Sequence, residues 1–306
     1  MKDLKILQEE LEKNSKNLNE EFKRIFHGRG GLWEEWKFLT IDSINHLLLV
    51  QFFFEIEKED EEAILTYLKD FIKTTKHDTI VLKRRYIRGS ETSIIIGEIK
   101  DEEVAIENGM KFWLNLTSNQ NIGYFGDMKN GRSFIESISK DKTVLNLFAY
   151  TCGFSLFAKR GGARGVVNVD MSKSVLATGQ KNHQINLLPT KGISFLPYNI
   201  LKSFARLKKK GPFDIIIIDP PTFQKGSFEA TKDYKKIITK LPQLASKECT
   251  LLACLNSPDL DEEFIINLIK ELAPSFVFEK RLPNLKEYKS LDETKSLKNL
   301  VFRRFI

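Results

Sequence analysis

A regular alternation of short β-branched runs and amphipathic segments, from Thr143 to the end, constrains the fold of this chain most strongly. Seven runs are typical of strands, and helical segments separate the first six: TVLNLFAY, VVNVD, ISFLPYN, DIIIID, TLLACLN, SFVFEKRL and NLVFRRFI. Strands that alternate with helices form right-handed crossovers and a parallel sheet with helices on both faces. Only a loop joins the last two runs, so the final strand should be antiparallel. The prediction is a seven-stranded, doubly wound α/β sheet.

The first part of the chain has a different pattern and predicts a small α+β module. The expected elements are a helix over 3–26, a strand over 46–54, a helix over 59–75, two strands (TIVLKRRYI and SIIIGEI) and a hairpin (VAIEN and KFWLNL). We therefore expect an N-terminal accessory domain at 1–104, with a possible role in RNA binding, and a larger domain at 105–306.

The composition restricts the class of protein more than its activity. There are 48 Lys and Arg against 41 Asp and Glu, a formal charge of +7 that is compatible with a polyanionic partner such as RNA. The three cysteines (Cys152, Cys249 and Cys254) form no CxxC pair, and the histidines have no ligand spacing, so no metal is expected. The sequence has neither the apolar core of a signal peptide nor a run of about 18 apolar residues, so we expect a soluble, cytoplasmic protein.

The turn after the first strand of the sheet lies where doubly wound sheets bind nucleotides. Glycines normally occupy such a turn, but here Phe148, Tyr150 and Cys152 stand at the expected positions and only Gly153 fits. An ordinary strand-to-helix turn is therefore the alternative interpretation.

Asp170 ends the second strand, where a carboxylate can accept hydrogen bonds from the hydroxyls of a ribose. The alternative for this residue is a helix N-cap, a role that Ser172 could also fill.

The segment Asp219-Pro220-Pro221 follows four consecutive isoleucines, which indicate a strand buried on both faces. Two prolines fix the backbone and would present a rigid polar corner at the edge of the sheet, suited to holding a reacting group. A simple loop start is the competing interpretation.

Together, VLNLFAYTCGFS, VVNVDMSK, KNHQIN and DIIIIDPPTFQKGSF resemble the class I S-adenosylmethionine-dependent methyltransferases, with their Rossmann-like sheet, over roughly 105–306. Within that class the similarity is to the bacterial large-subunit ribosomal RNA group with cytosine carbon-5 and guanine nitrogen-7 members. The resemblance implies S-adenosyl-L-methionine as cofactor and ribosomal RNA as partner. It also implies a set of cofactor-binding residues: Phe125, Asp127, Asn146, Phe148, Ala149, Tyr150, Thr151, Gly153, Asp170, Met171, Asn199 and Asp219.

Two positions depart from the pattern of that group. Asn199, which would approach the adenine amine, stands where the group more often has Asp, although an amide oxygen can accept the same hydrogen bond. Lys129 stands where Arg is common.

The resemblance places Asp219, Pro220 and Pro221 beside the transferred methyl group as catalytic residues. Methylation at pyrimidine carbon 5 would need a cysteine thiolate, but the aligned position is Asn256, and Cys254 two residues earlier is interpreted as a buried apolar residue. A nitrogen acceptor is therefore favoured. The expected substrate-binding residues are Thr222, Phe223, Lys225 and Asn256.

Basic and aromatic segments could contact RNA, or could be solvated surface: Lys83-Arg84-Arg85-Tyr86, 202–210 and 223–228. Two other functions stay open from the residues alone. One is a methyltransferase for a protein or small molecule; the other is an inactive homologue that binds RNA, which the absent turn glycines would suggest.

Overall fold

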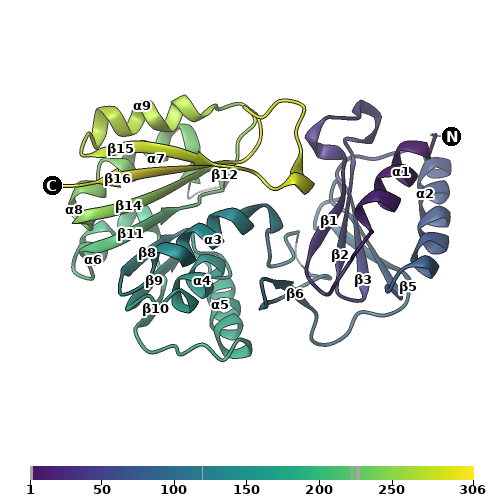
Figure 1. Ribbon diagram of the computed structural model, residues 1–306, viewed down its shortest axis with the longest axis horizontal. Coiled ribbons are helices and arrows are strands. Elements are labelled where there is room, and N and C mark those ends of the chain that lie inside the picture. Colours follow the sequence, from purple (N-terminus) through teal and green to yellow (C-terminus); the bar gives the residue numbers. More distant parts are fainter. Residues whose placement is uncertain (1–2, 119, 222, 225–227) are drawn as a thin grey trace. The chain divides into compact units, whose positions relative to one another are not determined.

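The computed structural model describes residues 3–118, 120–221, 223–224 and 228–306 (Figure 1). The chain forms two compact units. The first contains the residues up to Gly126 together with Leu285–Asp292, and the second contains Asp127–Asn284 and Glu293–Ile306. The chain therefore passes between the units three times. The expected boundary at 104/105 lies inside the first unit, and the accessory role of that unit is still a prediction.

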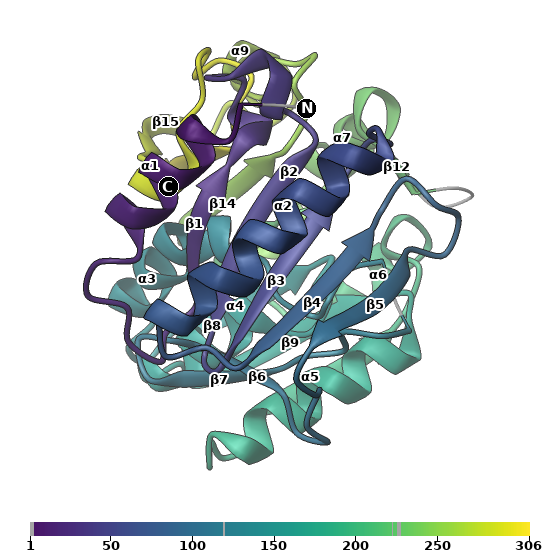
Figure 2. The same cartoon turned by 90° about the vertical axis from the view of Figure 1, so that its right-hand side faces the viewer.

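The first unit is built on a five-stranded sheet in the order β1-β2-β3-β4-β5. Its strands are β1 (Lys23–His27), β2 (Leu39–Ile44), β3 (Leu47–Phe52), β4 (Thr79–Arg84) and β5 (Glu91–Ile96), and the hairpin is formed by β6 (Val104–Glu107) and β7 (Met110–Trp113). Figure 2 shows the helices α1 (Lys5–Asn14) and α2 (Lys58–Phe71) along one face of this sheet. Their apolar sides join one core, in which Leu11 and Leu68 are fully buried.

The helix expected over 3–26 is wrong beyond Asn14. Asn17 has a φ of 63°, which breaks the helical course, and the chain then enters β1. β1 pairs antiparallel with β2, and this pairing buries Ile25 and Phe26. Contacts with a distant strand therefore determine the conformation of these residues, rather than their helical spacing.

The second unit contains the expected seven-stranded sheet, in the order β10-β9-β8-β11-β14-β16-β15. The strands are β8 (Thr143–Leu147), β9 (Gly165–Asp170), β10 (Ile193–Pro197), β11 (Phe213–Ile218), β14 (Ala245–Leu255), β15 (Phe276–Leu282) and β16 (Lys298–Arg304). β16 lies between β14 and β15 and is antiparallel to both, which confirms the prediction for the last strand. The strand order changes direction between β8 and β11, where such sheets bind ligands.

Helices cover both faces of this sheet (Figure 1). They are α3 (Lys129–Ile138), α4 (Gly153–Arg160), α5 (Lys173–Ile185), α6 (Phe204–Lys208), α7 (Ala230–Ile238), α8 (Leu241–Leu244) and α9 (Glu262–Leu272); two short strands, β12 (Phe223–Gln224) and β13 (Phe228–Glu229), precede α7. In β11, Ile216 and Ile218 join the core under α7 and α9, while Ile215 and Ile217 join the core under α3 and α4. The four isoleucines thus bury both faces of the central strand. Within the described ranges, no helix combines the length and the apolar character that a membrane span needs.

Candidate functional site

The turn between β8 and α4 has an unusual backbone. Phe148, Tyr150 and Cys152 have φ values of 58°, 46° and 63°, in the left-handed region that favours glycine. Non-glycine residues in this region cost on the order of 1–3 kcal/mol each and persist only where the surrounding structure holds them. The turn therefore has a glycine-type conformation at the three positions where the sequence lacks the expected glycines.

Asp170 at the end of β9 holds this turn in place. Its carboxylate accepts a hydrogen bond from the Tyr150 N–H at 3.0 Å and another from the Ser172 N–H at 2.9 Å. Burial raises the pKa of Asp170, and these backbone hydrogen bonds oppose the rise. The N-cap of α5 is Ser172, whose side chain accepts from the Val175 N–H. Capping thus falls to Ser172, and Asp170 connects the ends of β8 and β9.

A buried polar network extends from α5 to Asn146 in β8. The His183 Nδ1–H donates to the Gly179 carbonyl at 2.8 Å, so Nε2 accepts from the Ser155 hydroxyl at 3.1 Å. The Asn168 amide donates to Ser155 at 3.0 Å, and the Asn146 amide donates to Asn168 at 2.9 Å. These bonds use the donor group of Asn146. Its buried Oδ1 has no hydrogen-bond partner among the described residues.

Asn199 carries a second unsatisfied acceptor. This residue lies two positions after β10, at the start of a short 3₁₀ helix, and its buried Oδ1 also lacks a partner within the described part of the chain. A buried acceptor without a hydrogen bond is costly, so such atoms are usually completed by a ligand or water. The expected cofactor, S-adenosylmethionine, has donors of the required kind in its amino groups and ribose hydroxyls. The two unsatisfied acceptors, Asn146 and Asn199, therefore fit this cofactor.

Asp219 lies directly after β11, between the ends of β8 and β14. Its N–H donates to the Leu147 carbonyl at 3.4 Å, which joins the corner to the central strand. Desolvation raises the pKa of Asp219 to about 7, the negative charge of Asp127 adds to the rise, and the positive charge of Arg132 opposes it. Asp219 can therefore exist in both protonation states near neutral pH. Pro220 is buried and Pro221 is exposed.

Sequence reasoning missed two residues that support this corner. Arg132 in α3 is only 4% exposed and places a positive charge near Asp219. The buried hydroxyl of Tyr234 in α7 donates to the Cys254 carbonyl at 2.8 Å and contacts the Ile218 carbonyl at 3.3 Å, so it links the ends of β14 and β11. No local motif marks either residue; a long polar side chain on a buried helical face is the only sequence signal.

The other expected cofactor residues differ in their exposure. Ala149 and Thr151 are buried in the turn, and Gly153 is the first residue of α4. Phe125, in the first unit, is 42% exposed, and Met171 is 43% exposed. Their contact with the cofactor stays a prediction.

The expected substrate residues are only partly defined. Thr222 and Lys225 lie outside the described residues, and Phe223 is described only as backbone in β12. Asn256 follows β14 and is exposed. Cys254 is buried, and burial, with the charges of Asp219 and Asp127, raises the pKa of its thiol well above the ordinary value. It therefore lacks the thiolate that carbon-5 chemistry needs.

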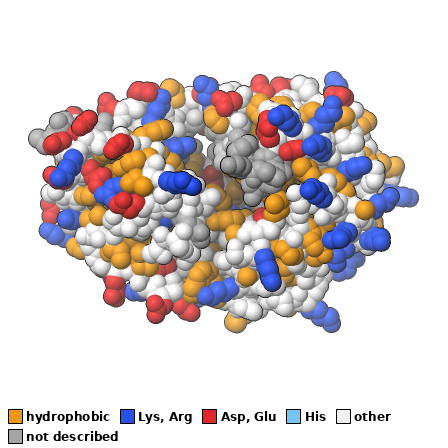
Figure 3. Space-filling view, turned by 180° about the vertical axis from the view of Figure 1, so that it is seen from behind, with side chains coloured by type: hydrophobic (Ala, Val, Ile, Leu, Met, Phe, Trp, Pro, Cys, Tyr) orange, Lys and Arg blue, Asp and Glu red, His pale blue; other side chains and the backbone are white. Residues whose placement is uncertain are grey.

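The expected RNA-binding cluster around Lys83 is largely engaged within the protein. Lys83 is buried and donates to the Leu116 carbonyl at 2.8 Å, and Arg84 forms ion pairs with Glu61 and Glu91. In Figure 3, Lys and Arg side chains are dispersed among apolar and acidic ones on the visible face. Among the described residues, no group of three or more His, Cys, Asp or Glu could hold a metal ion.

Known methyltransferases resemble this chain in sequence. The family model of S-adenosylmethionine-dependent methyltransferases matches residues 23–303. Ribosomal RNA large subunit methyltransferase I of Aeromonas salmonicida (strain A449) is 30% identical over 244 residues, which cover 77% of this chain and 61% of that protein. The chain thus spans about three fifths of the length of this relative.

Two solved structures extend the similarity to the fold. A Streptococcus mutans protein assigned as an S-adenosylmethionine-dependent methyltransferase has a TM-score of 0.88 at 22% identity, with 98% of this chain and 80% of that chain covered. SMU.776, in complex with SAH, has a TM-score of 0.83 at 22% identity, with 92% and 75% covered. At this identity the structures show the common fold alone.

Proposed function

Since the chain belongs to the family of S-adenosylmethionine-dependent methyltransferases, we propose that it methylates a base nitrogen of ribosomal RNA. The observation that carries the proposal is the arrangement at the carboxyl edge of the sheet. Two acceptors without a hydrogen bond lie on one side of the switch point, Asn146 in β8 and Asn199 after β10. Asp219 lies on the other side, after β11. This edge is where doubly wound sheets bind their ligands.

Three groups would hold the cofactor in this proposal. The Asn146 and Asn199 side-chain oxygens would accept from its amino groups, and each would then gain the hydrogen bond it lacks. Asp170 would accept from the ribose hydroxyls with the lone pairs that Tyr150 and Ser172 leave unused. The cofactor supplies an electrophilic methyl group on a sulfonium cation.

Asp219 would orient the acceptor base and take up its proton. A carboxylate with a pKa of about 7 is well matched to general-base work near neutral pH, and it would also favour the positive charge beside it. Pro220 and the Tyr234 hydroxyl would keep the corner fixed, since misplacement by about 1 Å can cost two orders of magnitude in rate.

The substrate assignment has two supports. The Aeromonas relative is named for methylation of large-subunit ribosomal RNA, and the basic composition suits such a polyanion. The choice of nitrogen rests on the thiol of Cys254, which is buried and protonated. A nitrogen lone pair needs no covalent activation by the enzyme.

The test is transfer of radioactive methyl groups to ribosomal RNA that lacks the modification, followed by nucleoside analysis. We expect a methylated nitrogen in the product, and loss of at least about a hundredfold in rate for Asp219→Asn even at a saturating concentration of S-adenosylmethionine, which offsets the cofactor affinity lost with the carboxylate charge. Transfer that proceeds equally without RNA would indicate a protein or small-molecule substrate. A product methylated at a ring carbon would contradict the nitrogen assignment.

A further inference from the structure

The first unit contains a cavity lined by charged, aromatic and apolar side chains, which the proposed methyl transfer does not use. It has a volume of about 250 Å³ and is lined by residues of α1, β1, the following loop and Leu285–Asp292, all of which belong to this unit. Five of the lining side chains are Lys or Arg and two are Glu, so the lining carries an excess of positive charge.

Part of this positive charge is not neutralised inside the protein. Arg24 pairs with the buried Asp42 and so contributes little net charge. By contrast, the ammonium groups of Lys286 and Lys289 have neither an ion pair nor a hydrogen bond among the described residues. The Lys23 ammonium donates one of its three N–H groups to the Asn14 carbonyl, at 2.8 Å, which leaves two for a ligand. These three lysines can bind an anion without first breaking a salt bridge.

His27 adds a neutral donor of fixed orientation. Its Nδ1 lies 2.9 Å from Nη1 of Arg24, and because a guanidinium can only donate, Nδ1 must accept and the ring hydrogen must be on Nε2. Burial and the charges of Arg24 and Arg29 lower the pKa of His27 to about 3, so the ring stays neutral. The Nε2–H has no partner within the described part of the chain.

An aromatic surface lies next to these donors. Trp33 lines the cavity, is only partly buried, and stacks on Phe26 with ring centroids 5.5 Å apart and planes 16° apart. The contact with Phe26 fixes the orientation of the indole. Its neighbour Leu32 is 39% exposed in the same lining. Lysines around a fixed aromatic ring are the combination with which proteins hold single-stranded nucleic acids, through phosphates and stacked bases.

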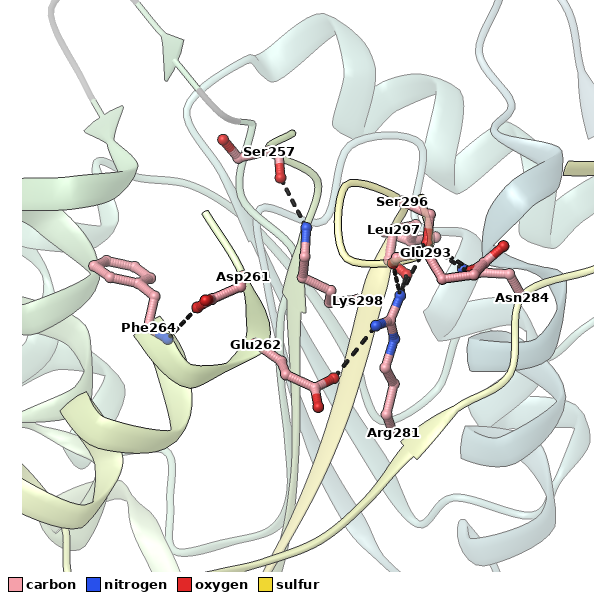
Figure 4. Close-up of polar contacts among 10 residues, drawn as sticks. All are labelled: Ser257, Asp261, Glu262, Phe264, Arg281, Asn284, Glu293, Ser296, Leu297 and Lys298. Carbon is pink, nitrogen blue, oxygen red and sulfur yellow. Dashed lines mark hydrogen bonds and ion pairs between the residues drawn. The ribbon is translucent and has the colours of Figure 1, made fainter. Parts of the chain in front are cut away.

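The two unpaired lysines come from a segment that leaves the sheet of the second unit and returns to it. Arg281 donates to the Glu293 carbonyl at 2.8 Å and to Ser296 Oγ at 2.9 Å, and the Asn284 amide donates to the same Oγ at 2.8 Å (Figure 4). These hydrogen bonds join the residues that precede the segment to the residues that follow it. Lys286 and Lys289 therefore belong to the first unit, although the residues on either side of their segment belong to the second.

We infer that this cavity binds a phosphodiester and an adjoining base of single-stranded RNA, with Lys23, Lys286 and Lys289 at the phosphate and Trp33 under the base. The inference rests on the proposed function, because the bound strand would be part of the RNA substrate.

The experiment measures binding of a fluorescent oligouridylate by the full chain across a range of salt concentrations. The variant is Lys286→Gln/Lys289→Gln, and the matched control is Lys58→Gln/Lys69→Gln, two exposed lysines of α2 outside the cavity. Each lost phosphate contact should lower affinity about fivefold at 0.1 M salt, and the slope of log K against log salt should become less negative by about 0.7 per contact. Trp33→Leu should weaken binding at least about fivefold without changing the slope.

S-adenosylmethionine binding by every variant serves as the folding control and should be unchanged. Equal affinity and slope for the cavity variant and the α2 control would overturn the inference, as would a wild-type chain that binds no oligouridylate. A cavity variant that weakens RNA binding in a chain that methylates no RNA would support the cavity and refute the proposed function. The two ideas can therefore fail separately.

Discussion

Replacement of Tyr150 by glycine and by alanine tests whether the turn after β8 is strained. Tyr150 has a φ of 46°, and its N–H is held by Asp170. Both variants remove the side chain and keep the N–H, so they differ mainly in backbone preference. A left-handed conformation costs a non-glycine residue about 1–2 kcal/mol, whereas the greater freedom of glycine in the unfolded chain costs about 0.5–1 kcal/mol. The glycine variant should therefore be more stable than the alanine variant by about 1 kcal/mol.

The assay is urea unfolding of the two variants, with Ala149→Gly as the control. Ala149 is adjacent and does not have a positive φ, so glycine there should destabilise the protein by about 0.5–1 kcal/mol. At each position the free energy of unfolding with glycine is compared with that with alanine. Glycine should be the more stable residue at position 150 and the less stable one at position 149. If Tyr150→Gly is the less stable of its pair, the turn is not strained and the reasoning from its backbone fails.

Three further predictions concern the carboxyl edge of the sheet. Affinity for S-adenosylmethionine should rise as pH increases from about 6 to 8, because the ionised form of Asp219, with a pKa of about 7, attracts the sulfonium. Calorimetry should find a weaker pH dependence for S-adenosylhomocysteine, which has no sulfonium charge. The same pH dependence of affinity for both ligands would exclude this role for Asp219. Tyr234→Phe should lower the free energy of unfolding by about 1–3 kcal/mol, since the Cys254 carbonyl loses its buried donor; a change below about 0.5 kcal/mol in urea unfolding would contradict this. Asp170→Ala should abolish the cofactor binding that calorimetry measures, and Asp170→Asn should have intermediate affinity because one side-chain oxygen still accepts hydrogen bonds. Wild-type affinity in Asp170→Ala would show that Asp170 is not part of the cofactor site.

The sheet of the second unit could be predicted because each of its strands is marked locally. The four isoleucines of β11 are buried on both faces, as an apolar run of that length requires. The antiparallel β16 followed from the lack of a helix before it. In the first unit, by contrast, the spacing of Leu7 and Leu11 correctly predicted α1, but nothing local showed that Phe26 would pair with Ile41 of another strand.

The site was harder to predict than the sheet because its features depend on tertiary contacts. The positions of the turn residues were identified, but a left-handed backbone at Phe148 or Cys152 cannot be derived from residue types that avoid it. Likewise, the raised pKa of Asp219 depends first on its burial and then on two charges that are distant in sequence, Asp127, which adds to the rise, and Arg132, which opposes it. A charge run in the sequence also did not show that Lys83 would be buried, since its burial depends on a hydrogen bond to the distant Leu116 carbonyl.

The three passages of the chain between its units also limit how such a protein can be shortened or recombined. A gene cut after Gly126 would encode most of the first unit but not Leu285–Asp292, and so would lack one wall of its cavity. A single protease cut at any one passage would leave the units joined by the other two. One recombination event therefore cannot add or remove the first unit as a whole, because Leu285–Asp292 is encoded apart from the rest of it.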